Sequence, residues 1–262
     1  FTGRTHAPET VDLRPRVSGY IESVDFVEGS LVEQGDILFT IDAAPFTAEM
    51  NRLKAELSMA KDQLSLAKAE YARAKKLGAS AAISKESLDQ RLSSQQQAQA
   101  RVHAVEAALE LAELQLSYTK IAAPISGKIS KANITKGNYV QAGQSSLSRI
   151  VSTNEIHAYF DADEVAYLNY AKAQNSGKTN PILMGLANQE GLPYNGKIDF
   201  IDNQVNPRTG TIRARASFEN ASGELIPGLF TRLQVIGNEA HVGVLIDDKA
   251  IATDLNNKYV LV

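Results

Sequence analysis

Cysteine is absent from all 262 residues of the chain. Its absence excludes a disulfide framework, a thiolate metal site and a cysteine nucleophile. It leaves both a periplasmic and a cytosolic location open, because compartments of either kind hold proteins without cysteine.

An excess of charge of one sign is lacking too, since 27 basic and 30 acidic residues give a net charge of −3. No global field attracts nucleic acid or an anionic membrane, and we expect no nucleic-acid partner. No stretch approaches the roughly 18 to 20 apolar residues that cross a bilayer. The first residues, "FTGRTHAPET", show no signal-peptide pattern, and the start at Phe1 predicts that an N-terminal segment has been removed.

Catalytic and metal-binding motifs are also missing. The histidines His6, His103, His157 and His241 are far apart in the sequence, and none has a further ligand at metal-site spacing. "DADE" (161–164) lacks the oxygen spacing and the glycine of a calcium loop. We find no G-x-S-x-G, no Walker sequence and no G-x-G-x-x-G. The sequence therefore predicts no metal, no cofactor and no catalysis.

An internal repeat is present, and it is split. "VSGYIESVDFVEGSLVEQG" from Val17 and "ISGKISKANITKGNYVQAG" from Ile125 align without a gap, and three of their identical pairs are glycines. Because glycine allows tight turns between short strands, we expect these glycines at the structural turns of a repeated unit. Two copies would pack as a quasi-symmetric β-sandwich. The glycine pairs are Gly19 with Gly127, Gly29 with Gly137, and Gly35 with Gly143.

A heptad pattern fills the interval between the copies, residues 45–118. Apolar residues follow one another every three or four positions along 46–77 and again along 85–117, with Gln95 weakening the second seam. Two helices of nearly equal length with a short link predict an antiparallel hairpin whose tip is at 78–84. Gly78 is expected to end the first helix, and Ser84 to cap the second. The expected seam residues are Phe46, Met50, Leu53, Leu57, Ala60, Leu64, Ala67, Tyr71 and Ala74, then Leu88, Leu92, Gln95, Ala98, Val102, Val105, Leu109, Ala112 and Leu116.

Period-two alternation follows the second copy, clearest in "TIRARASF" (211–218). Short alternating runs between glycines and prolines predict a small antiparallel barrel, capped by a helix near 163–173. The overall fold class is multidomain α+β. We expect a lipoyl-like β-sandwich at 13–44 and 119–151, the helical hairpin at 45–118, the β-barrel at 152–239, and a partial membrane-proximal β domain at 1–12 and 240–262.

This order of modules resembles the periplasmic adaptors, or membrane fusion proteins, of Gram-negative tripartite efflux pumps of the resistance-nodulation-division type. The split repeat, with "RPRVSGYI" from Arg14, is similar to the two halves of a lipoyl or biotinyl domain. "NPRTGTIRARASFENASGELIPGLFTRLQV" from Asn206 resembles the barrel of these adaptors and is the more specific part.

Adaptors that dock onto TolC-like outer-membrane channels resemble one another in an R-x3-L-x6-S pattern, and Arg73, Leu77 and Ser84 have that spacing. The resemblance implies that these residues form a channel-docking tip. It also implies a non-catalytic periplasmic adaptor that forms a ring, a hexamer in the assembled pump, between a proton-driven inner-membrane transporter and the channel. The tether to the inner membrane would lie in the missing N-terminal segment.

Two other interpretations stay open. An adaptor of an ATP-driven exporter or of a type I secretion system would have similar modules. A lipoyl or biotinyl carrier domain of an acyl-transfer enzyme would need a lysine on the turn between the two halves, where residues 42–45 read "DAAP".

Overall fold

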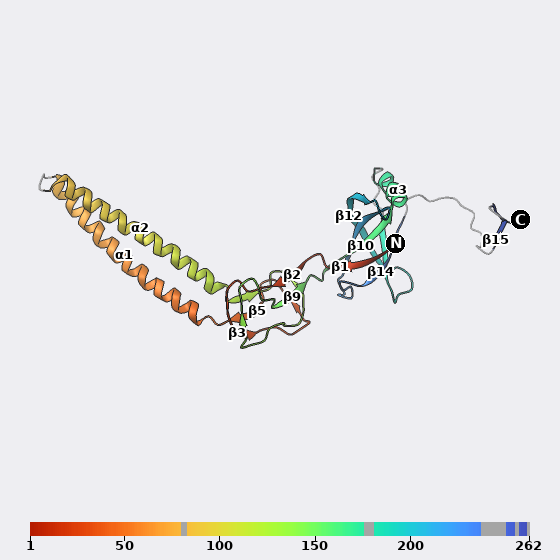
Figure 1. Ribbon diagram of the computed structural model, residues 1–262, viewed down its shortest axis with the longest axis horizontal. Helices are drawn as coiled ribbons and strands as arrows, with labels where there is room; N and C mark the ends of the chain where they lie inside the picture. Colours follow the sequence, from red (N-terminus) through yellow and green to blue (C-terminus); the bar gives the residue numbers. More distant parts are fainter. Residues whose placement is uncertain (80–82, 176–180, 237–249, 255–256, 261–262) are drawn as a thin grey trace. The chain divides into compact units, whose positions relative to one another are not determined.

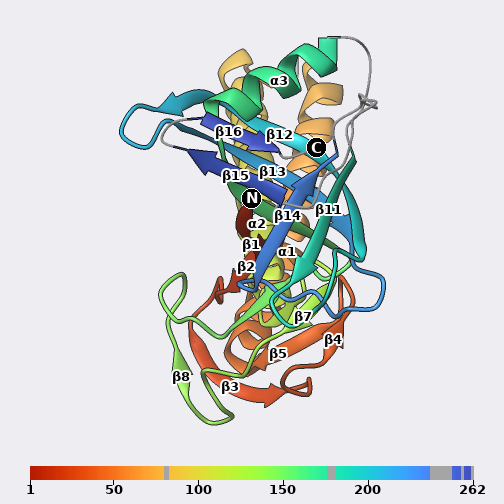
Figure 2. The ribbon, with the colours of Figure 1, turned by 90° about the vertical axis from the view of Figure 1, so that its right-hand side faces the viewer.

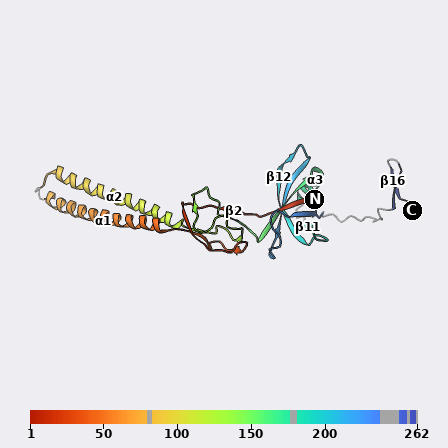
Figure 3. The same cartoon turned by 60° about the horizontal axis from the view of Figure 1, so that its bottom comes forward.

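The computed structural model describes residues 1–79, 83–175, 181–236, 250–254 and 257–260. The chain divides into two compact units, each described by itself below. Figures 1, 2 and 3 show the same ribbon from three directions. One unit consists of Ala7–Glu155 and Asn220–Leu225, and the other of Phe1–His6, Ile156–Glu219 and Ile226–Val262.

The sandwich in the first of these units has two sheets, and each sheet takes strands from both copies of the repeat. The two copies therefore interleave instead of forming separate lobes, and their apolar faces share one core that includes Phe39, Ile129 and Ile150. One sheet has the order β2 (Thr10–Leu13), β9 (Ser148–Val151), β7 (Gly127–Ile129), β4 (Leu31–Val32); the other has β6 (Lys120–Ala122), β5 (Ile37–Ile41), β3 (Gly19–Val24), β8 (Tyr139–Val140).

Matching side chains bind matching backbone groups across the two copies. The Gln34 amide donates to Oγ of Ser126 at 2.8 Å, and the Ala142 amide donates to Oγ of Ser18 at 2.9 Å. Ser18 and Ser126 are aligned in the repeat, as are Gln34 and Ala142. Each copy thus gives the other the same bond, which is the relation expected of a two-fold pseudo-symmetric pair.

Two long helices, α1 (Ala44–Ala79) and α2 (Lys85–Ser117), pack side by side (Figures 1 and 3). They are antiparallel, because Lys54 pairs with Glu113 and Lys61 pairs with Glu106. Every predicted seam position is buried or half-buried, including Gln95, so the heptad prediction is confirmed. The predicted end of the first helix is wrong by one residue, since α1 runs past Gly78.

The helices are anchored where they meet the sandwich. Phe46 and Tyr118 pack against the sandwich core, and the Ala44 amide donates to Oδ1 of Asp42 at 2.9 Å. Pro45 lies in the first turn of α1, where its missing amide hydrogen costs no helical bond.

The other unit contains a closed barrel. Alternation places Ile212, Ala214 and Ala216 inside, as predicted for 211–218, and α3 (Glu164–Asn175) lies at the position of the predicted short helix. The strand at 181–186 was not expected, because its apolar run shows no regular alternation. The strand order around the barrel is β1 (Thr2–His6), β10 (Glu155–Asp163), β13 (Thr211–Glu219), β12 (Tyr194–Asn206), β11 (Pro181–Leu186), β14 (Phe230–Val235).

The prediction that residues 1–12 join residues 240–262 in a separate domain is wrong. β1 pairs with β10 and β14 in the barrel, where Thr5 is buried and its hydroxyl donates to the Ile226 carbonyl at 2.7 Å. β2 pairs with β9 in the sandwich. Period-two alternation reveals a strand but not its partner, and both strands are short.

The C-terminal part of that predicted domain lies largely outside the described residues. Within it, β15 (Ile251–Asp254) and β16 (Asn257–Val260) form an antiparallel pair. Asn220–Leu225, predicted to belong to the barrel, groups instead with the sandwich unit. The Asn220 side chain explains this, since its Nδ2 donates to the Thr153 carbonyl at 2.8 Å and to the Leu225 carbonyl at 2.8 Å.

Candidate functional site

The predicted docking residues lie at the ends of α1 and α2 that are remote from β5 and β6. Arg73 and Leu77 are one helical turn apart near the end of α1, and Ser84 directly precedes α2. All three side chains are exposed, Leu77 by 50% of its surface. The middle of the link, residues 80–82, is outside the described part of the chain.

Ser84 has a structural role that its chemistry explains. Its backbone is extended, with φ −70° and ψ 151°, and its Oγ accepts a hydrogen bond from the Ser87 amide at 3.2 Å. It is therefore the N-cap of α2, as predicted, and it satisfies one of the amides that a helix start leaves unpaired. This bond uses a lone pair of the hydroxyl and leaves its hydrogen available to a partner.

Arg73, unlike Ser84, forms no hydrogen bond or ion pair with any described residue. Lys75 and Lys76 are exposed beside it, so the last turns of α1 present three cations. Positive charge is favourable at the C-terminal end of a helix, which is a sufficient structural reason for the lysines. An exposed five-donor guanidinium at the same end can also donate hydrogen bonds to a carboxylate or carbonyl oxygen of another protein.

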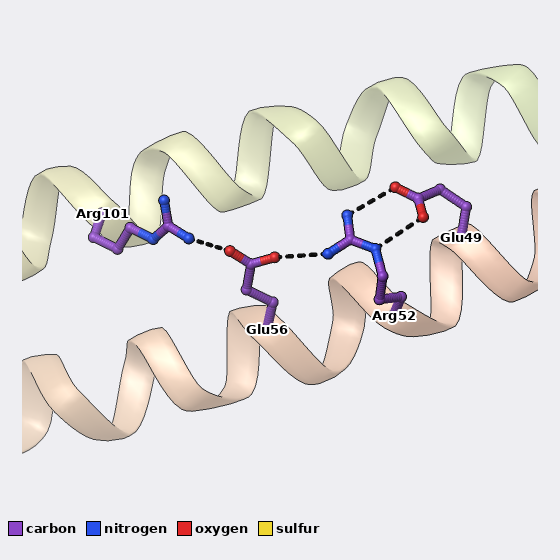
Figure 4. Close-up of polar contacts among 4 residues, drawn as sticks. All are labelled: Glu49, Arg52, Glu56 and Arg101. Carbon is purple, nitrogen blue, oxygen red and sulfur yellow. Dashed lines mark hydrogen bonds and ion pairs between the residues drawn. The ribbon is translucent and has the colours of Figure 1, made fainter.

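A chain of charges ties α1 to α2 along one side of the hairpin (Figure 4). Arg52 binds both oxygens of Glu49 at 2.8 Å and one oxygen of Glu56 at 3.0 Å, while the other oxygen of Glu56 accepts from Arg101 of α2. The hydrogen bond from Arg52 lowers the pKa of Glu49 below its ordinary value. These residues were not predicted, because Glu56 and Arg101 are distant in sequence and only the folded hairpin brings them together.

A second cross-helix pair, Arg91 to Glu70 at 2.8 Å, lies nearer the tip. With the pairs of Lys54 and Lys61 it fixes how far α2 is shifted along α1. Each such exposed pair stabilises the fold by less than about 1 kcal/mol. The pairs therefore contribute more to the register of α1 against α2 than to the stability of the hairpin.

The six repeat glycines fall into two groups. Gly29, Gly35, Gly137 and Gly143 have φ between 71° and 100°, a conformation that favours glycine, and they lie outside the strands. The prediction of turns is wrong for Gly19 and Gly127, which begin β3 and β7. Glycine is favoured at these two positions because there is no space for a side chain. A Cβ on Gly127 would lie 2.1 Å from the Val151 carbonyl oxygen.

The barrel surface carries an open groove of about 550 Å³ along β1 and β10. It is lined by Arg4, His6, Tyr159 and Arg213, and the last binds Asp161 at 3.2 Å. Among the described residues no group of three or more histidine, aspartate or glutamate side chains is placed to hold a metal ion. No helix in the described part of the chain is both long and apolar enough to cross a membrane.

Comparisons with known proteins agree with this architecture. Residues 9–152 match the family model of the barrel-sandwich hybrid domain of RND membrane fusion proteins, and residues 157–237 match the model of their β-barrel domain. Multidrug efflux pump subunit AcrA of Escherichia coli K12 is 36% identical over 243 residues, which are 89% of this chain and 60% of AcrA. The efflux pump periplasmic linker BepF of Brucella suis biovar 1 is 32% identical over 264 residues, covering 100% of this chain and 64% of BepF.

The chain thus spans about three fifths of the length of these curated relatives. Among solved structures, the membrane fusion protein Spr0693 of Streptococcus pneumoniae R6 superposes with a TM-score of 0.70 at 14% identity, over 91% of this chain and 99% of that one. This likeness concerns the fold alone. Two domain models that cover most of the sequence, and relatives above 30% identity along nearly its whole length, show the family. The chain belongs to the RND membrane fusion proteins.

Proposed function

We propose that this chain is the adaptor of a tripartite multidrug efflux pump and joins a proton-driven inner-membrane transporter to a TolC-like outer-membrane channel. The observation that carries the proposal is the hairpin of an RND membrane fusion protein with Arg73, Leu77 and Ser84 exposed at its tip. The RND class of both matching domain models favours a proton-driven transporter over an ATP-driven one.

The tip would bind the helix ends of the channel. Arg73 would donate charge-assisted hydrogen bonds, Leu77 would add an apolar contact, and Ser84 would donate its free hydroxyl hydrogen while it still caps α2. The protein would act in the periplasm, tethered to the inner membrane, as a ring of copies around the export path, six in the assembled pump. It would not be an enzyme, and the transporter would select the substrates.

The test compares two charge reversals on α1 of the full-length protein. Arg73→Asp would place an acid where the channel would present hydrogen-bond acceptors. Lys68→Asp makes the same charge reversal at an exposed α1 residue that lies farther from the tip. Each variant is expressed in a strain that lacks the gene, and drug susceptibility and crosslinking to the channel are measured.

We expect Arg73→Asp to abolish export and channel crosslinking, and Lys68→Asp to retain both. Both variants should melt within a few degrees of the parent protein, because neither side chain is buried. Normal export by a well-expressed Arg73→Asp variant would remove the docking role from the tip. A deletion strain with unchanged drug susceptibility would contradict the adaptor function itself, and co-purification with an ATP-driven exporter would favour the alternative transporter class.

A further inference from the structure

An open groove of the sandwich lies between β2 and β6, the strands that end its two sheets. Each of them pairs with one neighbour among the described strands, β2 with β9 and β6 with β5. The groove has a volume of about 400 Å³, and its lining includes Asp12, Arg14, Arg16 and Lys120. Because a strand at the end of a sheet leaves a row of backbone groups unpaired, it is a template for a further strand.

The free edge of β6 has two residues whose backbone groups can take part in such pairing. The Thr119 carbonyl accepts a hydrogen bond from the Ile41 amide at 2.8 Å, and the Ala123 amide donates to the carbonyl of the residue before β5 at 2.8 Å. Both residues therefore bond toward β5. Since alternate residues of a strand direct their backbone groups to opposite sides, Lys120 and Ala122 direct their amides and carbonyls away from β5.

Two arginines of the groove are held in place but keep most of their donors free. Arg14 and Arg16 are exposed and alternate with the buried residues of 13–17, so both lie on the outer side of this segment. The guanidinium of Arg16 lies over the Tyr118 ring, 4.9 Å from its centroid, and Nη1 of Arg14 donates to the Gly143 carbonyl at 3.0 Å. A stacked guanidinium still presents its N–H groups at its edge, where they can bind a carboxylate.

The groove has an excess of positive charge. Arg14, Arg16 and Lys120 form no ion pair with any residue in the described part of the chain. Asp12 is the one acid of the lining, and it binds Arg149 at 2.7 Å. These cations gather in a chain whose net charge is −3, so the groove favours an anionic partner that the rest of the surface does not.

From the free strand edge and the unpaired cations we infer that the groove binds an extended acidic peptide segment of another protein. The segment pairs with β6 and directs its carboxylates at Arg14, Arg16 and Lys120. In this mode of recognition, backbone hydrogen bonds give affinity and the side chains give specificity. The segment pairs with β6 and not with β2, because Asp12 of β2 would repel an acidic residue placed beside it, whereas Lys120 of β6 attracts one.

The groove also predicts the sequence pattern of the segment. Side chains of an extended strand point alternately to its two sides, so acidic residues at every second position all face the cations. The residues between them face the apolar part of the lining, which includes Val11 and Ile121. β6 is three residues long, or about 10 Å, and can pair with about three residues of a partner. We therefore expect a short segment in which acidic and apolar residues alternate.

This surface gives the adaptor a further partner and does not depend on channel docking at the hairpin tip. The probe is a fluorescent seven-residue peptide that alternates valine and glutamate, and its affinity for the full-length protein is measured by fluorescence anisotropy in 0.15 M salt. The control peptide has glutamine in place of each glutamate. We expect it to bind at least about tenfold more weakly, because each lost charge pair lowers the affinity by up to about fivefold.

Charge variants of the protein show whether the peptide binds in this groove. Arg16→Gln combined with Lys120→Gln should weaken binding by about tenfold. The matched control combines Lys128→Gln with Lys136→Gln, which removes the same charge at two exposed lysines of the sandwich that do not line the groove. This control should change the affinity by less than about twofold, since charges more than about 8 Å away are largely screened at this salt concentration. All four side chains are exposed, so we expect both variants to stay folded.

Two methylated peptides test the backbone pairing. One carries N-methyl groups on the glutamates and the other on the valines, and only one of these sets of amides can face β6. We therefore expect one methylated peptide to bind like the parent and the other to lose at least about tenfold in affinity. Amide hydrogen exchange at Lys120 and Ala122 should slow when the parent peptide is bound. Equal binding of both methylated peptides, equal binding of the glutamine peptide, or equal losses in the two charge variants would each overturn the inference. Inorganic polyphosphate that binds as tightly as the peptide would also overturn it, because the groove would then bind anions of any kind.

Discussion

Gly127 lies directly opposite Val32 where β7 pairs with β4. The aligned positions repeat this arrangement, since Gly19 lies opposite Val140 where β3 pairs with β8. Each copy of the repeat therefore places its first glycine against the valine of the other copy. These glycine–valine pairs therefore join the two copies, and substitutions of the glycines test how much these positions contribute to the stability of the sandwich.

Gly127→Ala should destabilise the sandwich more than Gly19→Ala. The new Cβ would lie 2.1 Å from a backbone oxygen at position 127, but 2.6 Å from the Ile41 methyl group at position 19, where a side chain can move. We expect Gly127→Ala to lower the free energy of unfolding by about 1 to 3 kcal/mol, the range of overpacking, and Gly19→Ala to cost less. Urea unfolding of the two variants measures the difference, and equal costs would contradict the steric explanation.

Gly29→Val and Gly137→Val should each cost roughly 1 to 3 kcal/mol through backbone strain alone. Both glycines have positive φ, 75° and 86°, and no atom lies within 4 Å of a Cβ built at either position. Asparagine, which tolerates this conformation better than a β-branched residue, is the matched control at each site and should cost clearly less. If valine and asparagine unfold at the same urea concentration, the loss does not come from φ.

The helical part of the fold could be predicted from the sequence because a heptad seam depends only on local spacing, and even Gln95 is half-buried on it as expected. Strand partners could not be predicted in the same way. Thr2–His6 is short and mostly polar, and nothing in its five residues indicates that it pairs with Glu155–Asp163 and Phe230–Val235. The serines that join the two copies were visible as identities in the repeat, but their bonds to backbone amides depend on the folded interleaving.

Asp12 should titrate below the ordinary aspartate range. The hydrogen bond from Arg149, and then the charges of Arg149 and Arg14, lower its pKa below 3.8. A lowered carboxyl pKa stabilises the folded state above the unfolded value and loses that stabilisation as the pH falls through the folded value. We expect Arg149→Gln to return the pKa of Asp12 toward 3.8 in an NMR titration, and Arg14→Gln to change it less. An unchanged Asp12 pKa in Arg149→Gln would show that the pair does not form in solution.

Glu56→Gln should weaken the chain of charges between α1 and α2 without unfolding the hairpin. Glu56 is the only member that joins Arg52 of α1 to Arg101 of α2 in this chain of four residues (Figure 4). A double-mutant cycle of Glu56→Gln with Arg101→Met should give a coupling energy below about 1 kcal/mol, which shrinks further in high salt. The pair Lys54 and Glu113, at 3.8 Å, is the matched comparison and should couple more weakly. A coupling of several kcal/mol would mean that these charges carry the hairpin's stability.

Ser84 offers a way to separate helix capping from docking, which the sequence pattern alone could not do because serine suits both. Aspartate caps a helix as well as serine and adds a favourable charge at the helix N-terminus, whereas alanine removes the cap at a cost of about 1 kcal/mol. Ser84→Asp should therefore keep the thermal stability of the hairpin, and Ser84→Ala should lower it. Aspartate, however, has no hydrogen to donate and brings a negative charge to the tip, so we expect Ser84→Asp to lose drug export and channel crosslinking while it stays folded. If Ser84→Asp exports normally and Ser84→Ala loses export only in proportion to its lost stability, Ser84 is a helix cap and takes no part in docking.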